Sequence, residues 1–408
     1  MNLITFGEPI TVAFRKSAGG STVTFEAGRE YLLANSQIER LLKDENVQRK
    51  SYKISKADMR IPNFNVRAAK KGDRVLLYNG SGGYGDQIMT WPVAHLLAKF
   101  GFDVHILTDP GNNVCWWNFP WIKSLQTIPI LWEHAKMFDH FCIFEAVINM
   151  DEHQDQGHPL DVMLNKIGID PQTVTPEEKL VRPVFTYSET SALQGFKVTE
   201  RKVALYQLAS ANPVRCYPPS DSAFLIQKIA EAFPDTHWLC LYDEFVPKAY
   251  AEMLNCKECK GTGMVPAADK GADEKATKTI QCPACGGTKY LAKNVEPFCA
   301  PNLRELWALT EHVSVVVSPD SMMVHVAGAF GTPCVGMWGP VSPERRTCYY
   351  KGHNAIFHRE FCPHSPCFVY SAAFPKYCPP RPSARTTCDV LAGISPEEVI
   401  EMVKKVRR

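Results

Sequence analysis

Two pairs of cysteines form the strongest chemical pattern in this 408-residue sequence. Cys256 and Cys259 form one C-x2-C pair, and Cys282 and Cys285 form a second pair after a spacer of 22 residues. Glycines follow each pair and permit the tight turns that surround a tetrahedral metal. Four thiolates are typical of a structural Zn²⁺ site and leave no open coordination position for catalysis. The sequence therefore predicts a structural zinc in an insertion over residues 255–293.

Four more cysteines lie in a Pro-rich segment near the end of the chain. They are Cys362, Cys367, Cys378 and Cys388, and their spacing is irregular. The N-terminus lacks the uninterrupted apolar run of a signal peptide, so a reducing, cytoplasmic environment is expected and metal binding is favoured over disulfides. A second zinc is one interpretation of this cluster. Unbonded thiols or a disulfide are the others.

A glycine-rich turn follows the first apolar run of the chain's alternating part. Gly82, Gly83 and Gly85 let the backbone approach an anion or an acceptor at the start of a helix. Asp86 comes next, and the helix dipole should keep its carboxylate ionised and able to accept a proton. Asp86 as a helix cap is the alternative. Gly80, Gly82 and Gly85 also fit the dinucleotide-binding pattern G-x-G-x-x-G, and Asp109 follows about 20–25 residues later, where a ribose-binding acid would lie. An NAD(P)-dependent oxidoreductase that uses the Gly80–Gly85 turn is therefore a rival hypothesis.

A second candidate site follows a later apolar run, where Asp320 and Ser321 precede a helix and His325 lies one turn inside it. Backbone amides at a helix N-terminus, the Ser321 hydroxyl and His325 form a set suited to holding a diphosphate. A Ser/Asp cap beside a packed histidine is the structural alternative.

Alternating strand and helix patterns must position these residues. Short apolar runs at 75–78, 104–107, 203–208, 238–242, 313–317 and 334–338 predict strands, and helical spacing lies between most of them. This βαβ alternation predicts parallel sheets covered by helices. The whole chain is 45% hydrophobic and 22% charged, with 45 Lys and Arg against 43 Asp and Glu, which is typical of a soluble protein. No membrane-spanning run is present in the sequence.

The sequence divides into four predicted parts. Residues 1–70 form a small, basic, β-rich module, and 71–195 a Rossmann-like domain. Residues 196–390 form a second Rossmann-like domain, which contains the cysteine insertion, and 391–408 a C-terminal helix. From Met1 to Arg74 there are 14 Lys and Arg against 8 Asp and Glu, a surplus that would suit phosphate contact or a solvated face.

Three segments resemble the ADP-heptose:lipopolysaccharide heptosyltransferases of glycosyltransferase family 9. Gly85–Pro92 resembles the family's G-D-x-(apolar)-x-(S/T)-x-P turn, and Asn302–Pro340 resembles its S-L-R-E-L … D-S-G-x-x-H … F-G-P signature. Val203–Leu208 followed by Arg215–Pro218 is similar to its strand followed by K-x-W-P. The resemblance covers residues 74–406 without the insertion, which itself resembles the DnaJ-type zinc-binding module.

The resemblance implies an α/β GT-B fold, two Rossmann-like domains facing a cleft, and an inverting, metal-independent glycosyltransferase. Asp86 would be the general base, Arg215 would contact the donor phosphate, and Asp320, Ser321 and His325 would fall at donor-binding positions. The donor would be a nucleotide-diphosphate sugar of ADP-heptose type. The acceptor would be a saccharide such as lipopolysaccharide, or a modified nucleic acid. A non-catalytic binding or structural protein derived from such a transferase is a further alternative.

Two departures from the family pattern concern the donor. Met322 stands where the family has a glycine, and Arg215 replaces a lysine, which preserves charge but changes the contact from a point to a fork. These two differences bear on which nucleotide sugar is the donor more than on the type of reaction.

Overall fold

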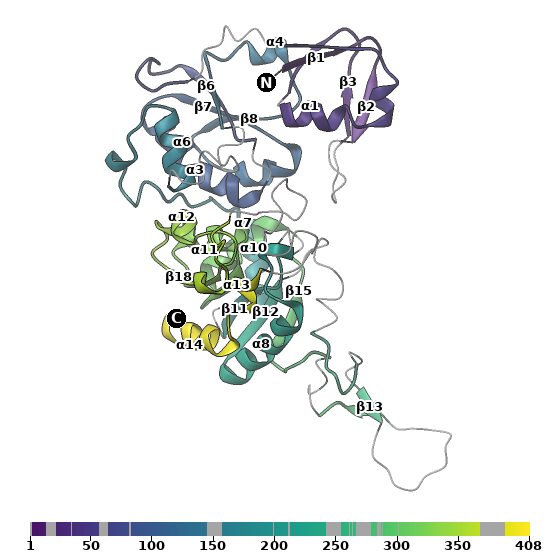
Figure 1. The fold of residues 1–408 in the computed structure, drawn as a ribbon, viewed down its shortest axis with the longest axis vertical. Coiled ribbons are helices and arrows are strands. Elements are labelled where there is room, and N and C mark those ends of the chain that lie inside the picture. The colour runs from purple at the N-terminus through teal and green to yellow at the C-terminus, as the bar shows by residue number, and fades with distance from the viewer. Residues whose placement is uncertain are drawn as a thin grey trace. The chain divides into compact units, whose positions relative to one another are not determined.

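The computed structural model consists of two compact units, Met1–Val184 and Phe185–Arg408 (Figure 1). The structure describes residues 2–13, 22–33, 35–56, 64–80, 83–144, 157–198, 200–210, 213–241, 254–260, 262, 264–266, 279–283, 287, 289–300, 302–367 and 388–408. Gly82, Cys285 and Cys378 lie outside these residues. The predicted four-part division stays a prediction.

The first unit begins with antiparallel strands and continues as an α/β domain. Its strands are β1 (Asn2–Phe6), β2 (Ile10–Ala13), β3 (Thr22–Phe25), β4 (Glu30–Leu33), β5 (Tyr52–Lys56), β6 (Arg74–Tyr78), β7 (Asp103–Thr108), β8 (Ile122–Thr127), β9 (Ile130–Leu131) and β10 (His140–Ile143). Its helices are α1 (Asn35–Leu41), α2 (Glu45–Gln48), α3 (Tyr84–Lys99), η1 (Pro110–Trp116), α4 (Trp132–Ala135), α6 (Pro159–Lys166) and η2 (Pro171–Thr173). The short strand β9 extends the N-terminal sheet, whose order is β5-β1-β4-β9, so the α/β part contributes a strand to the N-terminal module.

The second unit is built on one six-stranded parallel sheet. The strands of this unit are β11 (Lys202–Gln207), β12 (Thr236–Leu241), β13 (Met264–Pro266), β14 (Thr279–Gln281), β15 (Val295–Phe298), β16 (Val316–Pro319), β17 (Cys334–Met337) and β18 (His353–Ile356). Strands β13 and β14 form a separate two-stranded sheet. Its helices are α7 (Tyr187–Ser191), η3 (Ala192–Phe196), η4 (Pro213–Arg215), α8 (Pro219–Ala232), α10 (Leu303–His312), α11 (Met322–Phe330), α12 (Glu344–Thr347), η5 (Arg359–Phe361), α13 (Asp389–Ala392) and α14 (Pro396–Val406). Helices α8 and α14 pack together (Figure 1).

The two parallel sheets share one topology. The first has the order β10-β6-β7-β8, and the first four strands of the second have the order β16-β11-β12-β15. In each unit the chain moves outward from its first strand and then returns to that strand's other side. The strand order therefore reverses beside β6 and beside β11. In parallel α/β sheets, ligands bind outside the carboxyl ends of the strands at such a reversal.

Local sequence signals explain the elements that flank these points. Gly101 follows α3 with a φ of 92°, a left-handed conformation that glycine adopts readily and that commonly ends a helix. The C-terminal helix predicted within residues 391–408 is present as α14, at Pro396–Val406, and Ser395 and Glu398 form a capping box at its start. The predicted strand at 313–317 is shorter and later, at Val316–Pro319.

A buried ion pair ties the start of the second unit to its core. Arg304 of α10 is fully buried, and its Nε donates to Glu189 Oε1 of α7 at 2.5 Å. Its guanidinium carbon lies 5.3 Å from the centre of the Phe185 ring. Burial acts to raise the pKa of Glu189, but hydrogen bonds from Arg304 and from the Thr186 backbone N–H outweigh burial and hold that pKa below its usual range.

Replacing Arg304 by Met should lower the free energy of unfolding by about 3–5 kcal/mol, because Glu189 would stay buried without its partner. Urea unfolding followed by tryptophan fluorescence measures this loss. The folded pKa of Glu189 is lowered, so the contribution of the pair is present at neutral pH and is lost as the pH falls below 4.5, the ordinary value. Equal stability of variant and wild type at pH 7 would contradict this assignment.

Candidate functional site

Asp86 lies in the first turn of α3, at the carboxyl end of β6. Its Oδ2 accepts a hydrogen bond from the Gly83 N–H at 3.3 Å, which forms one half of a capping box. A Cβ on Gly83 would lie 3.0 Å from Asp86 Oδ2, so a side chain there would crowd the carboxylate. The side chain is half-buried. The helix N-terminus favours the ionised carboxylate, which is the form that a general base requires.

A polar network fixes the backbone of this turn. Asn79 directly follows β6, and its Nδ2 donates to the Asp86 carbonyl at 3.1 Å and to Thr90 Oγ1 at 2.6 Å. Gln87 Nε2 donates to the Asn79 carbonyl at 3.2 Å, and Trp116 Nε1 donates to Gln87 Oε1 at 2.9 Å. These buried bonds hold the first turn of α3 against the strand and against η1. The position of Asp86 is therefore fixed by this hydrogen-bond network as well as by its own bond to the Gly83 N–H.

The second candidate site lies where the strand order of the larger sheet reverses. Arg215 ends η4, which follows β11, and Asp320 follows the neighbouring strand β16. Arg215 Nη1 lies 3.5 Å from Asp320 Oδ2, and it donates to the Asp320 carbonyl at 3.4 Å. The structure thus brings together two residues that are 105 positions apart in the sequence.

This pair is buried and incompletely hydrogen-bonded. The Asp320 side chain is 6% exposed and that of Arg215 is 21% exposed. Arg215 Nε and Asp320 Oδ2 are buried and have no hydrogen-bond partner in the described part of the chain. Buried charged groups normally have all their hydrogen bonds, so both atoms have capacity for a further polar group.

Ser321 begins helix α11 beside this pair. Its Oγ accepts from the Met323 N–H at 3.3 Å and lies 2.8 Å from Ser318 Oγ. Trp307 Nε1 donates to the sulfur of Met322 at 3.4 Å, so the Met322 side chain is held against α10. Met322 is therefore accommodated at the first position of the helix by packing against its neighbour.

His325 is placed deeper than the sequence suggests. It is 4% exposed, and its Nδ1 lies 2.9 Å from the Tyr350 hydroxyl. The Tyr350 ring lies so close to Gly328 that a Cβ there would come within 2.3 Å of it. Tyr350 was not among the predicted residues, since only the packing on Gly328 identifies it. His325 is thus a buried, oriented histidine on helix α11.

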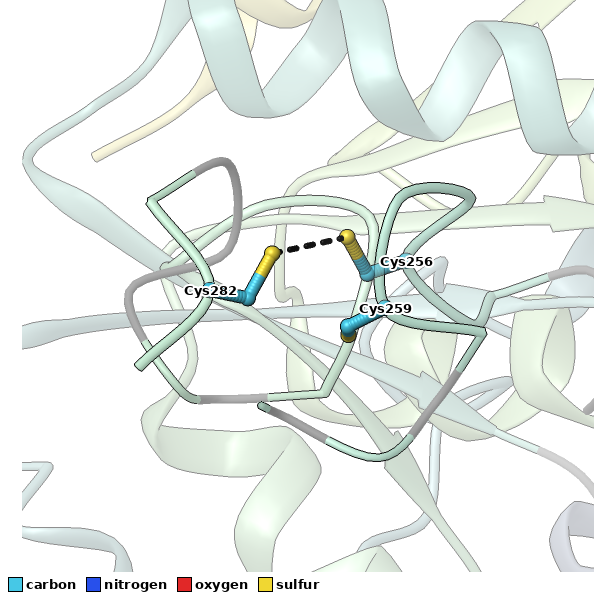
Figure 2. Close-up of side chains that lie close together, drawn as sticks. All are labelled: Cys256, Cys259 and Cys282. Atoms are coloured by element: carbon cyan, nitrogen blue, oxygen red, sulfur yellow. Dashed lines mark hydrogen bonds between the residues drawn. The ribbon is translucent and has the colours of Figure 1, made fainter. Parts of the chain in front are cut away.

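Three of the four predicted zinc ligands gather in the insertion. Cys256, Cys259 and Cys282 are buried, and their sulfur atoms all lie within 4.8 Å of one another (Figure 2). Cys256 Sγ lies 3.8 Å from Cys282 Sγ. A tetrahedral ion with bonds of about 2.3 Å to sulfur would separate its ligands by about 3.8 Å. The three cysteines therefore fit a zinc ion in spacing and chemistry.

Backbone hydrogen bonds and strand pairing hold the chain segments on either side of these cysteines close together. An isolated bridge pairs Asn255 with Tyr290, and the Cys256 N–H donates to the Lys289 carbonyl at 2.9 Å. Strands β13 and β14 pair between the two cysteine pairs. The Thr262 N–H donates to the Cys259 carbonyl at 3.0 Å, which closes the turn after the first pair.

The C-terminal cysteines are less close together. Cys362 and Cys388 are buried and Cys367 is half-buried, but among the described residues they do not form a metal-sized group. Burial raises the pKa of the Cys388 thiol to about 11. A second zinc stays a prediction.

Comparisons with known proteins agree with the fold. The family model described as glycosyltransferase family 9 (heptosyltransferase) matches residues 248–378, which include Asp320, Ser321 and His325. A search of curated proteins finds no match. Among the described residues, no helix combines the length and apolar character needed to cross a membrane.

Three solved structures share the fold at low sequence identity. ADP-heptose LPS heptosyltransferase II of E. coli is 14% identical, with 81% of this chain and 98% of that chain covered and a TM-score of 0.52. A family 9 glycosyl transferase of Veillonella parvula is 13% identical, with coverages of 82% and 97% and a TM-score of 0.54. The iron-containing, dodecameric glycosyltransferase TibC of enterotoxigenic E. coli is 10% identical, with coverages of 95% and 87% and a TM-score of 0.51.

Changing Cys282 to Ser should reduce the bound metal by about one equivalent per chain, because a neutral hydroxyl is a far poorer zinc ligand than a thiolate. Elemental analysis of the purified protein measures this change. Cys348, which is exposed and lies away from both cysteine groups in the sequence, is the matched control, and C348S should keep the full metal content. Equal metal content in C282S and wild type would show that the insertion holds no ion.

The predicted α/β GT-B fold is confirmed by these structural matches, and the family match together with this fold supports the predicted glycosyltransferase of heptosyltransferase type.

Proposed function

We propose that this protein transfers a sugar from a nucleotide-diphosphate sugar of ADP-heptose type to an acceptor hydroxyl, with inversion and without a catalytic metal. The observation that carries the proposal is the ion pair between Arg215 and Asp320. This pair lies where the strand order of the second unit reverses, beside the N-terminus of α11. One positive side chain and the amides of a helix start are the groups that an anionic diphosphate requires. TibC has also been solved in complex with ADP-D-β-D-heptose.

The proposed reaction assigns one role to each unit. The Asp86 carboxylate removes the proton of the acceptor hydroxyl, whose oxygen then forms a bond to the anomeric carbon of the donor sugar. The bond from that carbon to the diphosphate oxygen breaks, and the nucleoside diphosphate leaves with the electron pair. Arg215 and the N-terminus of α11 stabilise the charge that develops on the leaving group. Asp320 and Ser321 hold these donor groups in place.

Two contacts disfavour an oxidoreductase that uses the glycine turn. Gln37 Nε2 donates to Asp109 Oδ1 at 2.6 Å, so the N-terminal module engages the carboxylate that would bind a ribose. The Asp86 carboxylate accepts from the Gly83 N–H, a donor that a pyrophosphate would need. Asp86 would also place negative charge beside that pyrophosphate. The glycosyltransferase hypothesis makes use of the same carboxylate.

The insertion is proposed to hold a structural metal. Cys256, Cys259 and Cys282, with Cys285 as the predicted fourth ligand, would bind Zn²⁺, which would crosslink the insertion. TibC is described as iron-containing, so iron is the competing ion. Elemental analysis distinguishes the two.

Replacing Asp86 by Asn should lower kcat by about 10²–10⁴-fold, because the amide cannot take the acceptor's proton. Release of nucleoside diphosphate in the presence of donor and acceptor measures the rate. Asp103 lies at the opposite end of the same sheet, and D103N is the matched control with unchanged activity. Full activity of the D86N variant would refute the proposed base. An inactive wild type that binds nucleotide sugars would instead favour a non-catalytic binding protein.

Replacing Arg215 by Met should weaken donor binding by about 10–100-fold, since hydrogen bonds to charged groups contribute about 1.5–3 kcal/mol. Isothermal titration with ADP measures the affinity. The variant leaves Asp320 buried without its cation, so the R215M/D320N double variant separates lost binding from lost stability. R359M changes an exposed arginine and should leave the affinity unchanged. Wild-type affinity in the folded double variant would rule out this donor site.

A further inference from the structure

Four buried polar atoms near the glycine turn of the first unit have no hydrogen-bond partner among the residues that the structure describes. They are Thr108 Oγ1, both side-chain polar atoms of Asn112, and Asn113 Oδ1. Thr108 is fully buried and Asn112 is 1% exposed. An unpaired buried polar group costs about 1–3 kcal/mol, so native structures seldom keep several of them together. Their concentration within six residues points to a bound polar group.

The segment that carries these atoms lies at the same sheet edge as Asp86. Tyr78 of β6 pairs with Leu107 of β7, so the next residues, Asn79 after β6 and Thr108 at the end of β7, both lie at the carboxyl edge of the sheet. Asn79 holds the first turn of α3 through the Asp86 carbonyl. Trp116 ties the end of η1 to Gln87 of α3. Thr108–Asn113 is therefore fixed beside the helix that carries the proposed base.

Strand alternation gives Thr108 a defined direction. Leu107 packs in the cluster that includes Leu3 and Leu32 of the N-terminal module. Since successive side chains of a strand point to opposite faces, Thr108 points away from that cluster. The β7 strand contacts α3 as well as η1. The unpaired hydroxyl thus lies on the face of the sheet opposite the N-terminal module.

Poor local packing does not explain the unpaired atoms, because the neighbouring polar groups are paired. Asn79, Gln87, Thr90 and Trp116 all hydrogen-bond within the same layer. The backbone N–H of Asn112 also donates, to the Asp109 carbonyl at 2.8 Å. The side chains of Thr108, Asn112 and Asn113 nevertheless keep polar atoms without partners among the described residues, as does His105 Nε2 on β7.

The charge of this sheet edge restricts what can bind. The described parts of the segments that follow the four parallel strands are residues 79–80, 83–90, 108–121, 128–135 and 144, and they contain three Asp and Glu residues and no Lys or Arg. Arg29 of the N-terminal module is paired with Glu26 and Glu133. An acceptor with phosphate or carboxylate groups would be repelled here, since such groups are normally bound by Arg or Lys.

We propose that Thr108, Asn112 and Asn113 bind the hydroxyl groups of an uncharged saccharide acceptor beside Asp86. An asparagine amide both donates and accepts hydrogen bonds, as does a sugar hydroxyl, so the two are matched partners. This inference rests on the proposed glycosyltransferase function. It selects, among saccharide acceptors, neutral sugars over phosphorylated ones.

Replacing Asn112 by Leu tests this site, because leucine has the same branched shape as asparagine and no polar atoms. The variant should be as stable as the wild type or more stable, since the unpaired amide is removed. Its KM for a neutral methyl glycoside acceptor should rise by about 10–100-fold, while its KM for the nucleotide sugar stays unchanged. Asn165 is exposed near the end of α6, and N165L is the matched control with both constants unchanged. T108V should raise the acceptor KM in the same direction.

A binding experiment without donor separates this inference from the proposed function. Saturation-transfer NMR with methyl α-mannopyranoside and mannose 6-phosphate as probes should show binding of the neutral sugar by the wild type and at least tenfold weaker binding by N112L. That result supports the site even if no donor gives transfer, in which case the proposed function alone fails. Equal binding by a folded N112L, or a preference for the phosphorylated sugar, would overturn the inference and leave internal water as the partner of these atoms.

Discussion

The order of the strands in each parallel sheet is the constraint on which both candidate sites depend. Right-handed crossovers place successive parallel strands side by side. When the chain later adds a strand on the other side of its first strand, that first strand becomes an interior strand of the sheet. The loops after the first and fourth strands then diverge and leave space at the carboxyl edge. In the first unit this edge carries Asp86, and in the second it carries Arg215 and Asp320. One topology therefore creates two sites.

The two edges differ in charge in a way that suits the two halves of one reaction. The second unit places a cation and a helix start at its edge, where a diphosphate leaving group would gain negative charge. The described segments that follow the parallel strands of the first unit contain Asp86, Asp109 and Glu133 and no Lys or Arg, and this charge would weaken the binding of a second anion. A base that must take a proton from a neutral hydroxyl benefits from that environment, because nearby positive charge would lower its basicity. The same charge pattern that favours a neutral acceptor thus also favours Asp86 as a base.

Much of the architecture could be predicted from the sequence, because local signals determine it. The apolar runs of β6 and β11 gave the correct strands, and Gly101 after α3 and the capping residues Ser395 and Glu398 of α14 are further local signals of this kind. Strands β10 and β18 were not predicted, since each is defined by its pairing with a neighbouring strand, β6 or β17. The contact of Tyr350 with His325 and the unpaired atoms of Asn112 also depend on packing between distant segments. The sequence shows which residue types a site contains, but it does not show which of their polar atoms find hydrogen-bond partners in the folded chain.

The cysteine insertion shows how a large addition can leave a parallel sheet intact. It enters after β12 and returns at β15, yet these strands pair directly from Trp238 with Val295 to Leu241 with Phe298. Fully buried Leu254 and the bridge from Asn255 to Tyr290 close the base of the insertion next to the sheet. Closing a long loop costs conformational entropy that grows only slowly with its length, so the cost is met mainly at this base. A metal bound by cysteines on both sides of the β13–β14 hairpin would then order the insertion from within, and the sheet edge at Arg215 and Asp320 would keep its geometry whatever the insertion binds.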